Sequence, residues 1–136
     1  MIGASIDCYE TALQYSLERK QFSKPIAGYQ LTQAKFAEML TQITMGQLTV
    51  YQLGRLKDQS KMRFDQVSLA KRNHCSIARD IARSCRDILG GNGIIEDYSP
   101  MRHMTNIETV FTYEGTHEMH SLILGQSVTG IAAYDS

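Results

Sequence analysis

The sequence has no net charge and few residues that break or cross-link a chain. Its 14 Lys and Arg balance 14 Asp and Glu, so the chain as a whole gives no indication of a nucleic-acid or anionic-membrane partner. No apolar run approaches the ~18 residues of a membrane span, and no secretory pattern opens the chain. A length of 136 residues is typical of one domain, so we expect residues 1–136 to form a single bundle.

Cysteine and proline are both scarce, and each scarcity limits the fold. Cys8, Cys75 and Cys85 are odd in number and match no zinc-binding spacing, which favours reduced thiols in a cytosol-like compartment. Only 2 prolines occur, and the turn signals lie far apart along the chain. Both features favour an all-α fold.

Apolar residues recur at helical spacing in five segments, which predicts an up-down bundle of about five helices. The first helix would present one face made of Ile2, Ile6, Tyr9, Leu13 and Leu17. The second would present Phe36, Met39, Leu40, Ile43, Val50, Leu53 and Leu56. The third would present Val67, Ala70, His74, Ile77, Ala78, Ile81, Cys85 and Ile88. Two shorter helices would carry Met101, Met104, Ile107 and Phe111, then Met119, Leu122 and Ile123.

The second and third helices are separated by a polar stretch. Residues 57–64 predict a loop because they are mostly charged and polar. Asp65 would then cap the third helix, and Phe64 would pack against Leu69 as a hydrophobic staple.

Later turn signals bound the remaining helices. The glycine-rich residues 90–93 would stop the third helix, because several of them tolerate positive φ. Ser99 and Pro100 suit the N-cap and first position of the fourth helix. Thr116 would cap the last.

The histidines allow a structural and a functional interpretation. His117, Glu118 and His120 resemble a zinc motif, but the histidines are three residues apart and not four, which argues against a metal site. His74 lies on the apolar face of the third helix. A hydrogen-bonded core or interface histidine is the better interpretation of that position.

One carboxylate stands on a short connection near the end of the chain, in FTYEGTHEMH (111–120). Glu114 lies between Tyr113 and Gly115, directly before the last predicted helix. A glutamate in this position can be directed into a cleft, where desolvation raises its basicity. The alternative is a solvent-exposed loop residue.

Three segments at the breaks between helices resemble one known family. The carboxy-terminal domain of the acyl-CoA dehydrogenases, flavoproteins that desaturate acyl thioesters, is similar to this chain at ERKQFSKPIAGYQ (18–30), DILGGNGI (87–94) and TYEGTHE (112–118). The resemblance covers nearly the whole chain. Within the family, residues 53–59, 69–83 and 112–125 look most like glutaryl-CoA dehydrogenase.

The resemblance implies an FAD-dependent oxidoreductase. Glu114 would be the base that removes the α-proton of an acyl-CoA thioester while a β-hydride passes to N5 of FAD. The implied substrate is glutaryl-CoA, the implied acceptor is electron-transfer flavoprotein, and the implied assembly is a homotetramer. The location would be the cytoplasm in a bacterium or the mitochondrial matrix in a eukaryote.

The resemblance also implies cofactor contacts. Arg19 matches the arginine that reaches the FAD pyrophosphate of a neighbouring subunit, a role that suits a guanidinium group. Other positions that match flavin contacts of the same segment are Gln21, Phe22 and Gln30. The adenosine side of that neighbouring FAD would meet Asp87, Gly90 and Gly91. Asp87 departs from the glutamine that many relatives carry.

The remaining implied contacts surround Glu114. Thr116 matches a residue that touches the subunit's own FAD, where a helix N-terminus suits an anion. Glu118 would lie near the same cofactor, although many relatives instead have a glutamine two residues later. Tyr113 and Gly115 would contact the substrate.

The relatives also possess an amino-terminal helical domain and a middle β-domain. This chain corresponds to roughly their last third, so we expect it to be the carboxy-terminal domain of a larger flavoenzyme and to be inactive by itself. The alternative is a non-catalytic helical scaffold that assembles oligomers and retains the YEG motif only by descent.

Overall fold

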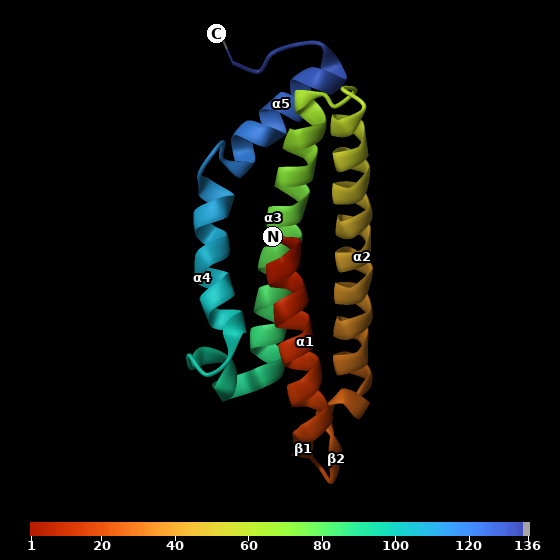
Figure 1. Cartoon of the computed structure of the whole chain (residues 1–136). Coiled ribbons are helices and arrows are strands. Elements are labelled where there is room, and N and C mark those ends of the chain that lie inside the picture. Colours follow the sequence, from red (N-terminus) through yellow and green to blue (C-terminus); the bar gives the residue numbers. More distant parts are fainter. Residues whose placement is uncertain (135–136) are drawn as a thin grey trace.

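Five helices form an up-down bundle in the computed structural model, which describes residues 1–134 (Figure 1). The helices are α1 (Ile2–Glu18), α2 (Gln30–Asp58), α3 (Phe64–Leu89), α4 (Ser99–Thr112) and α5 (His117–Thr129). The shorter elements are β1 (Lys20–Gln21), β2 (Lys24–Pro25), η1 (Ile26–Gly28) and η2 (Gly90–Ile94). The predicted all-α fold with five helices is confirmed.

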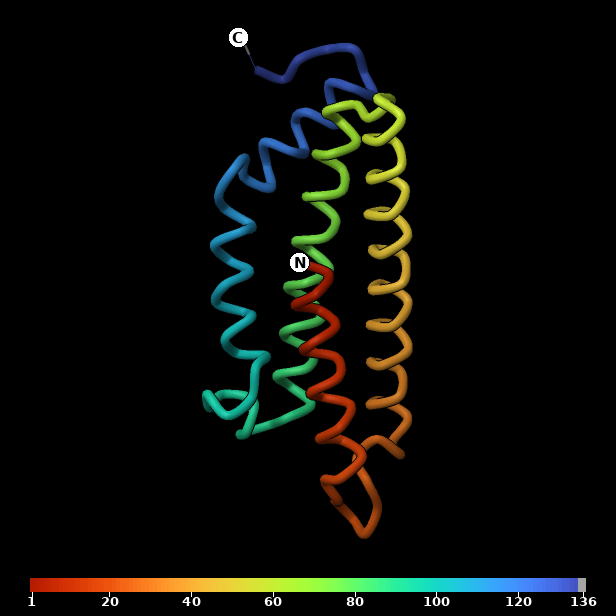
Figure 2. The backbone as a smooth tube through the Cα atoms, viewed as in Figure 1, coloured from red at the N-terminus to blue at the C-terminus, as the bar shows by residue number. Residues whose placement is uncertain are grey.

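Helix α3 is the centre of the bundle, because it contacts each of the other four helices. The backbone tube in Figure 2 shows α1, α2 and α4 arranged around it, with the chain bending between α4 and α5. The small hairpin of β1 and β2 projects beyond the lower end of the bundle in this view.

The apolar face of α3 supplies much of the core, as its spacing predicted. Its buried members run from Ala70 to Cys85, with Leu89 at the end of the helix, and they pack against Phe36, Met39 and Ile43 of α2. All three cysteines are buried free thiols. The predicted faces extend too far, however, because Leu40, Val50 and Val67 are exposed.

The face that α1 buries differs from the predicted one. Its completely buried residues are the small side chains Ser5, Cys8, Ala12 and Ser16, each with 0% exposure. The predicted apolar face lies at the margin of the core, and Leu17 is 53% exposed. The distance between packed helices depends on the side chains at their contact, so small residues let α1 lie close against α3.

The connection between α2 and α3 is shorter than predicted, and its capping is different. Helix α2 continues to Asp58 and α3 begins at Phe64, so only residues 59–63 remain between them. Arg63, not Asp65, is the N-cap residue. The predicted staple is counted from Asp65, so with Arg63 as the N-cap Phe64 and Leu69 do not occupy the staple positions, and they are 75% and 49% exposed.

Asp65 instead joins the start of α3 to the end of α5. Its carboxylate accepts bonds of 3.0 and 2.9 Å from the Arg63 guanidinium and one of 2.6 Å from the Ser127 hydroxyl. These bonds, first that from Arg63 and then that from Ser127, hold the pKa of Asp65 well below its usual range.

The start of α4 is shifted by one residue from the prediction. Tyr98 is the N-cap, and Ser99 is the first helical residue. The Ser99 hydroxyl lies 3.2 Å from that of Thr11, so it links α4 to α1. The cap of α5 is as predicted, because Thr116 Oγ1 accepts a bond of 3.3 Å from the backbone N–H of Met119.

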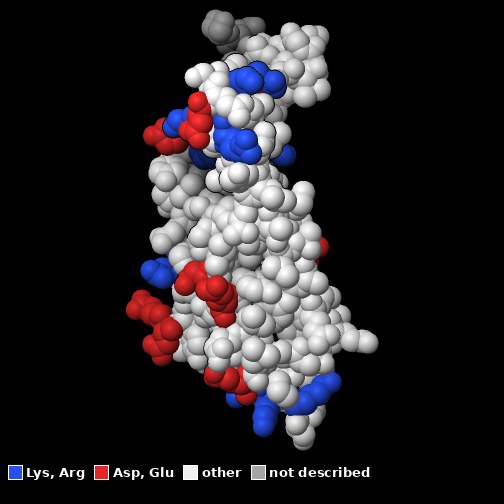
Figure 3. Space-filling model, turned by 45° about the vertical axis from the view of Figure 1, so that its right-hand side comes forward, with Lys and Arg blue, Asp and Glu red and all other residues white. Residues whose placement is uncertain are grey.

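A broad uncharged surface lies between charged ends of the molecule (Figure 3). Residues 39–54 of α2 contain no charged side chain, and several of their apolar side chains are exposed. They are Leu40, Met45, Leu48, Val50 and Tyr51. Among residues 1–134, no helix combines the length and apolar character needed to cross a bilayer.

The close contact of α1 with the core gives a stability test. Ala12→Leu places a large side chain where the present one has 0% exposure, so the free energy of unfolding should fall by about 1–3 kcal/mol. Leu17→Ala, on the exposed side of the same helix, should change it by less than about 0.5 kcal/mol. Urea unfolding of both variants measures the difference. A larger loss of stability for Leu17→Ala than for Ala12→Leu would instead indicate that α1 buries the face predicted from the sequence.

Candidate functional site

The Glu114 turn connects α4 to α5 and has an unusual backbone conformation. Glu114 has φ of 52° and Gly115 has φ of 89°, so two successive residues are left-handed. A residue other than glycine in this region costs on the order of 1–3 kcal/mol, and surrounding contacts must offset that cost.

A lysine of α3 contacts the backbone of this turn. Lys71 Nζ donates hydrogen bonds to the carbonyl oxygens of Tyr113, Glu114 and Gly115, the last two at 3.0 and 2.7 Å. The same ammonium lies 5.6 Å from the centre of the Tyr113 ring. The Glu114 turn is therefore attached to the central helix.

The imidazole of His120 lies directly beneath the turn. His120 is buried, and a Cβ atom on residue 115 would lie 3.0 Å from its Nε2 atom. Burial lowers the pKa of His120, and the charge of Lys71 lowers it further. A neutral imidazole therefore fills the space that the absent side chain of Gly115 leaves open.

A stack of side chains supports the same turn from the side of α4. The Phe111 and His117 rings are parallel to within 9°, with their centres 4.5 Å apart. The Arg79 guanidinium lies 4.2 Å from the centre of the Phe111 ring and donates a bond of 2.8 Å to Glu108. His117 and His120 thus serve stacking and packing on the two sides of the turn.

Glu114 and Tyr113 line a cavity of about 530 Å³. Its other walls come from α1, α2, α3 and α4 and consist of Met1, Ile2, Val50, Lys71, His74, Cys75 and Val110. His74 is buried as predicted, but its Nε2 atom has no hydrogen-bond partner within residues 1–134. Burial lowers the pKa of His74, which favours a neutral ring in this wall.

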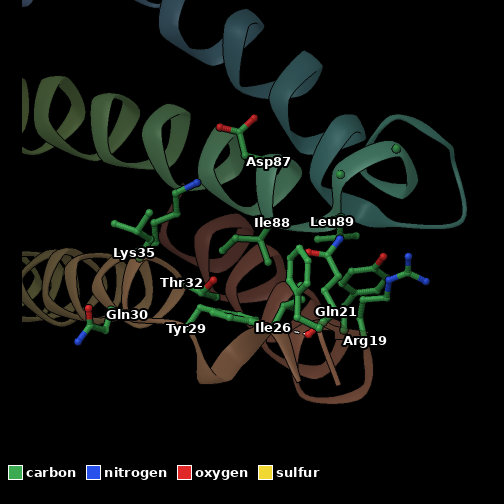
Figure 4. Close-up of a pocket in the computed structure, with 15 residues that line it drawn as sticks. Arg19, Gln21, Ile26, Tyr29, Gln30, Thr32, Lys35, Asp87, Ile88 and Leu89 are labelled. Carbon is green, nitrogen blue, oxygen red and sulfur yellow. Dashed lines mark hydrogen bonds between the residues drawn. The ribbon is translucent and has the colours of Figure 1, made fainter. Parts of the chain in front are cut away.

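A second cavity, of about 720 Å³, lies between the hairpin, the start of α2 and the end of α3 (Figure 4). It brings together seven of the residues predicted to contact a cofactor. They are Arg19, Gln21, Phe22, Gln30, Asp87, Gly90 and Gly91. The end of α1, the hairpin, the start of α2 and the end of α3 therefore meet at this cavity.

The hairpin holds its tip in a defined conformation. Phe22 and Ser23 have φ of 47° and 68°, which is typical of a type I′ turn, and Phe22 is 92% exposed. The Tyr29 hydroxyl donates a bond of 2.7 Å to the Gln21 carbonyl oxygen (Figure 4). The Ile26 N–H donates another, of 2.8 Å, to the Arg19 carbonyl oxygen.

The charges in this cavity favour an anion. Arg19 and Lys35 line it, and neither forms an ion pair with another residue of the described part of the chain. Lys35 was missed by the sequence analysis, although it lies one turn after Thr32 on the same side of α2. The Asp87 carboxylate points away from Arg19 and pairs with Arg86 (Figure 4).

Thr116 and Glu118 lie at the Glu114 turn and not at the hairpin cavity. Thr116 caps α5, and Glu118 is in the first turn of that helix. The backbone N–H of Glu118 and then the Thr116 hydroxyl lower the pKa of the Glu118 carboxyl. The two sets of predicted cofactor residues are thus on different parts of the bundle (Figure 1).

Together these features define an all-α domain with a carboxylate on a left-handed turn and a separate cavity lined by cations. Residues 1–129 match the family described as acyl-CoA dehydrogenase, C-terminal domain, so the chain belongs to this family. The crystal structure of glutaryl-CoA dehydrogenase from Mycobacterium smegmatis is similar over 98% of this chain, with 49% identity and a TM-score of 0.96. A structure of that enzyme in complex with FADH2 gives 48% identity.

Curated relatives include two proteins named as reductases. A 3-(aryl)acrylate reductase from Clostridium sporogenes is 30% identical over 93% of this chain. A caffeyl-CoA reductase–Etf complex subunit from Acetobacterium woodii is 31% identical over 90%. The chain spans 34% and 32% of these two proteins, and 35% of the Mycobacterium smegmatis structure.

The contact between Gly115 and His120 predicts a cost for any side chain at this position. Gly115→Ala would place a Cβ 3.0 Å from Nε2 at a φ of 89°, so the free energy of unfolding should fall by about 1–3 kcal/mol. Gly125→Ala, in α5, should instead raise it by about 0.5–1 kcal/mol, because within residues 1–134 no atom outside the adjoining helix backbone lies within 4 Å of the new Cβ. Thermal unfolding of the two variants tests this. Equal stability of Gly115→Ala and the unchanged protein would contradict it.

Proposed function

We propose that this chain is the carboxy-terminal domain of an FAD-dependent acyl-CoA dehydrogenase that acts on glutaryl-CoA. Glu114 is the base that removes the α-proton of the thioester. The observation that carries the proposal is the left-handed Glu114 turn, held by Lys71 beside a cavity. Identity of 49% to glutaryl-CoA dehydrogenase supports the choice of substrate.

The chemistry requires a carboxylate in a fixed position. The α-proton of a thioester is weakly acidic, so its base must be held against it in a dry site. The Glu114 turn orients the carboxylate through its backbone. Glu114 is exposed in this chain, so water would be excluded from it by bound substrate and the rest of the complete enzyme. FAD, when bound, supplies the acceptor for the β-hydride. Where such an enzyme works as a reductase, the same glutamic acid returns the α-proton.

The hairpin cavity fits the phosphate-bearing part of FAD. Arg19 and Lys35 supply positive charge, and a guanidinium group can bind phosphate oxygens with two hydrogen bonds. Gly90 has φ of 61°, and in the described part of the chain no atom beyond the adjacent residues lies within 4 Å of the Cβ position of Gly90 or Gly91. The backbone there is open to close approach from outside. The exposed ring of Phe22 is available to cover such a ligand.

The separation of the two sites supports one further part of the proposal. Glu114, Thr116 and Glu118 serve the subunit's own FAD, while the FAD of a neighbour is served by Arg19, Gln21, Phe22, Gln30, Asp87, Gly90 and Gly91. A homotetramer supplies that neighbour, and the uncharged surface of α2 fits its contact. Electron-transfer flavoprotein is the proposed acceptor, which agrees with the relative named as part of an Etf complex.

A helical oligomerisation scaffold remains the second candidate, because the uncharged surface of residues 39–54 suits it equally well. A scaffold has no need of a carboxylate at residue 114. The role of Glu114 therefore separates the two functions.

Glu114→Gln in the complete flavoenzyme should keep FAD and acyl-CoA binding but slow flavin reduction by on the order of 10²–10⁴-fold, because an amide cannot accept the α-proton. Glu114→Asp should lose about 100-fold, since the carboxylate is set back. Stopped-flow absorbance with glutaryl-CoA measures both rates. Glu96→Gln, on an exposed loop, is the matched control and should react like the unchanged enzyme.

A rate for Glu114→Gln within a few-fold of the unchanged enzyme would exclude Glu114 as the base. Glu118, in the first turn of α5, would then be tested in the same way.

The uncharged surface of α2 predicts self-association of the chain itself. At tens of micromolar, sedimentation velocity should show species larger than 15.3 kDa, because exposed apolar patches of this kind are typical of interfaces. Leu48→Glu and Tyr51→Glu should shift the chain toward the monomer, since each buries a charge in that contact. A single monomeric species before any substitution would contradict the proposed assembly.

A further inference from the structure

We propose that Lys71 is a positioning residue for the base: its ammonium holds three successive carbonyl groups of the Glu114 turn and so directs the carboxylate into the cavity. The inference rests on the proposed role of Glu114. The contact itself does not depend on that role: one ammonium group of α3 binds the backbone carbonyl oxygens of the turn.

The backbone conformation and the lysine depend on each other. In an extended chain successive carbonyl groups point in alternating directions, so three of them cannot meet one atom. Positive φ at Glu114 and Gly115 turns the carbonyl oxygens of residues 113–115 toward a common point, and Lys71 Nζ occupies it. An ammonium group has three N–H donors on a single atom, one for each oxygen.

The surroundings of Lys71 support a positioning role and differ from those of an ordinary surface lysine. Within residues 1–134 its ammonium forms no ion pair with a carboxylate, so its charge is directed at the three carbonyl dipoles. Lys71 is half-buried and lines the same cavity as Glu114. The ammonium also lies over the Tyr113 ring, so the ring and the three carbonyl oxygens of the turn both contact it.

Lys71 also connects the turn to the central helix of the bundle. It lies on α3, between the buried residues Ala70 and His74. Its bonds to the turn join residues 42 to 44 positions apart in the sequence. Without them the Glu114 backbone would keep only the packing on His120 and the stack at the ends of its two flanking helices, and neither contact bonds to its carbonyl groups. A left-handed glutamate would then relax toward ordinary φ, and its carboxylate would move.

The first experiment measures flavin reduction by glutaryl-CoA in the complete enzyme, together with FAD content and the Kd of acyl-CoA. Lys71→Met keeps an unbranched side chain that is one atom shorter and removes its donors. The rate at saturating substrate should fall by about 10–100-fold, because a displacement of an ångström costs about 100-fold. The Kd should change by less than about threefold, since the ammonium of Lys71 donates to the backbone of the turn and so has no N–H left for the substrate.

Two further variants separate geometry from charge and from general effects of substitution. Lys71→Arg retains the charge, but its planar fork cannot direct three donors to one point, so its rate should be intermediate. Lys61→Met, in the exposed connection between α2 and α3, should react like the unchanged enzyme. A Lys71→Arg rate below that of Lys71→Met would contradict the proposal.

Chemical rescue tests the contact directly. In Lys71→Ala, added propylammonium should restore flavin reduction with a saturable concentration dependence, because its three N–H donors can replace those of Nζ. Tetramethylammonium has the same charge without any N–H group and should not restore the rate. Rescue by both ions, or by neither, would overturn the proposal. So would the loss of FAD from both Lys71→Met and Lys71→Ala, which would assign Lys71 to folding.

The result for Glu114→Gln separates this inference from the proposed function. If Glu114→Gln is slow while Lys71→Met reacts within about threefold of the unchanged rate, Lys71 does not position the base and the function stands. If Glu114→Gln reacts normally, the function itself is wrong. In the Glu114→Gln background, Lys71→Met should cause no further loss, because the two residues act in one step.

Discussion

Close packing of α3 against every other helix is the constraint on which both candidate sites depend. The small buried face of α1 brings that helix against α3, and the apolar face of α2 covers another side. One continuous helix then reaches the Glu114 turn through Lys71 and the hairpin cavity through its end at Leu89. The two sites are fixed relative to each other because the same element carries residues of both.

The Glu114 turn shows why a strained backbone needs several supports. The positive φ of Glu114 is unfavourable for a residue other than glycine, and three contacts around the turn offset that cost. Lys71 holds the carbonyl oxygens, His120 fills the space under Gly115, and the stack of Arg79, Phe111 and His117 supports the adjoining helix ends. A catalytic base must be held close to one particular proton of the substrate. For such a base, the rate gained from a fixed position outweighs the stability that the strained backbone costs the protein.

Local signals in the sequence were enough for the fold and for the position of the turn, but not for contacts between distant segments. The face of α3 followed its spacing, and Thr116 capped α5 as its residue type predicted. The buried face of α1 was misjudged because Ser5 and Ser16 do not register as apolar, although small size is what lets the helix approach α3. Lys71 and Lys35 could not be recognised, since each gains its partners only when helices far apart in sequence come together.

The arrangement of the two sites has a consequence for assembly under the proposed function. The base and the phosphate-binding cations cannot serve one FAD within a single bundle if they belong to the flavins of different subunits. Each complete active site then requires residues from two copies, so assembly precedes activity. The uncharged surface of α2 lies between the charged ends, and α2 itself begins at the hairpin cavity. An interface formed through α2 would therefore lie on the same helix as residues of the hairpin cavity, so subunit contact and cofactor binding would share one element.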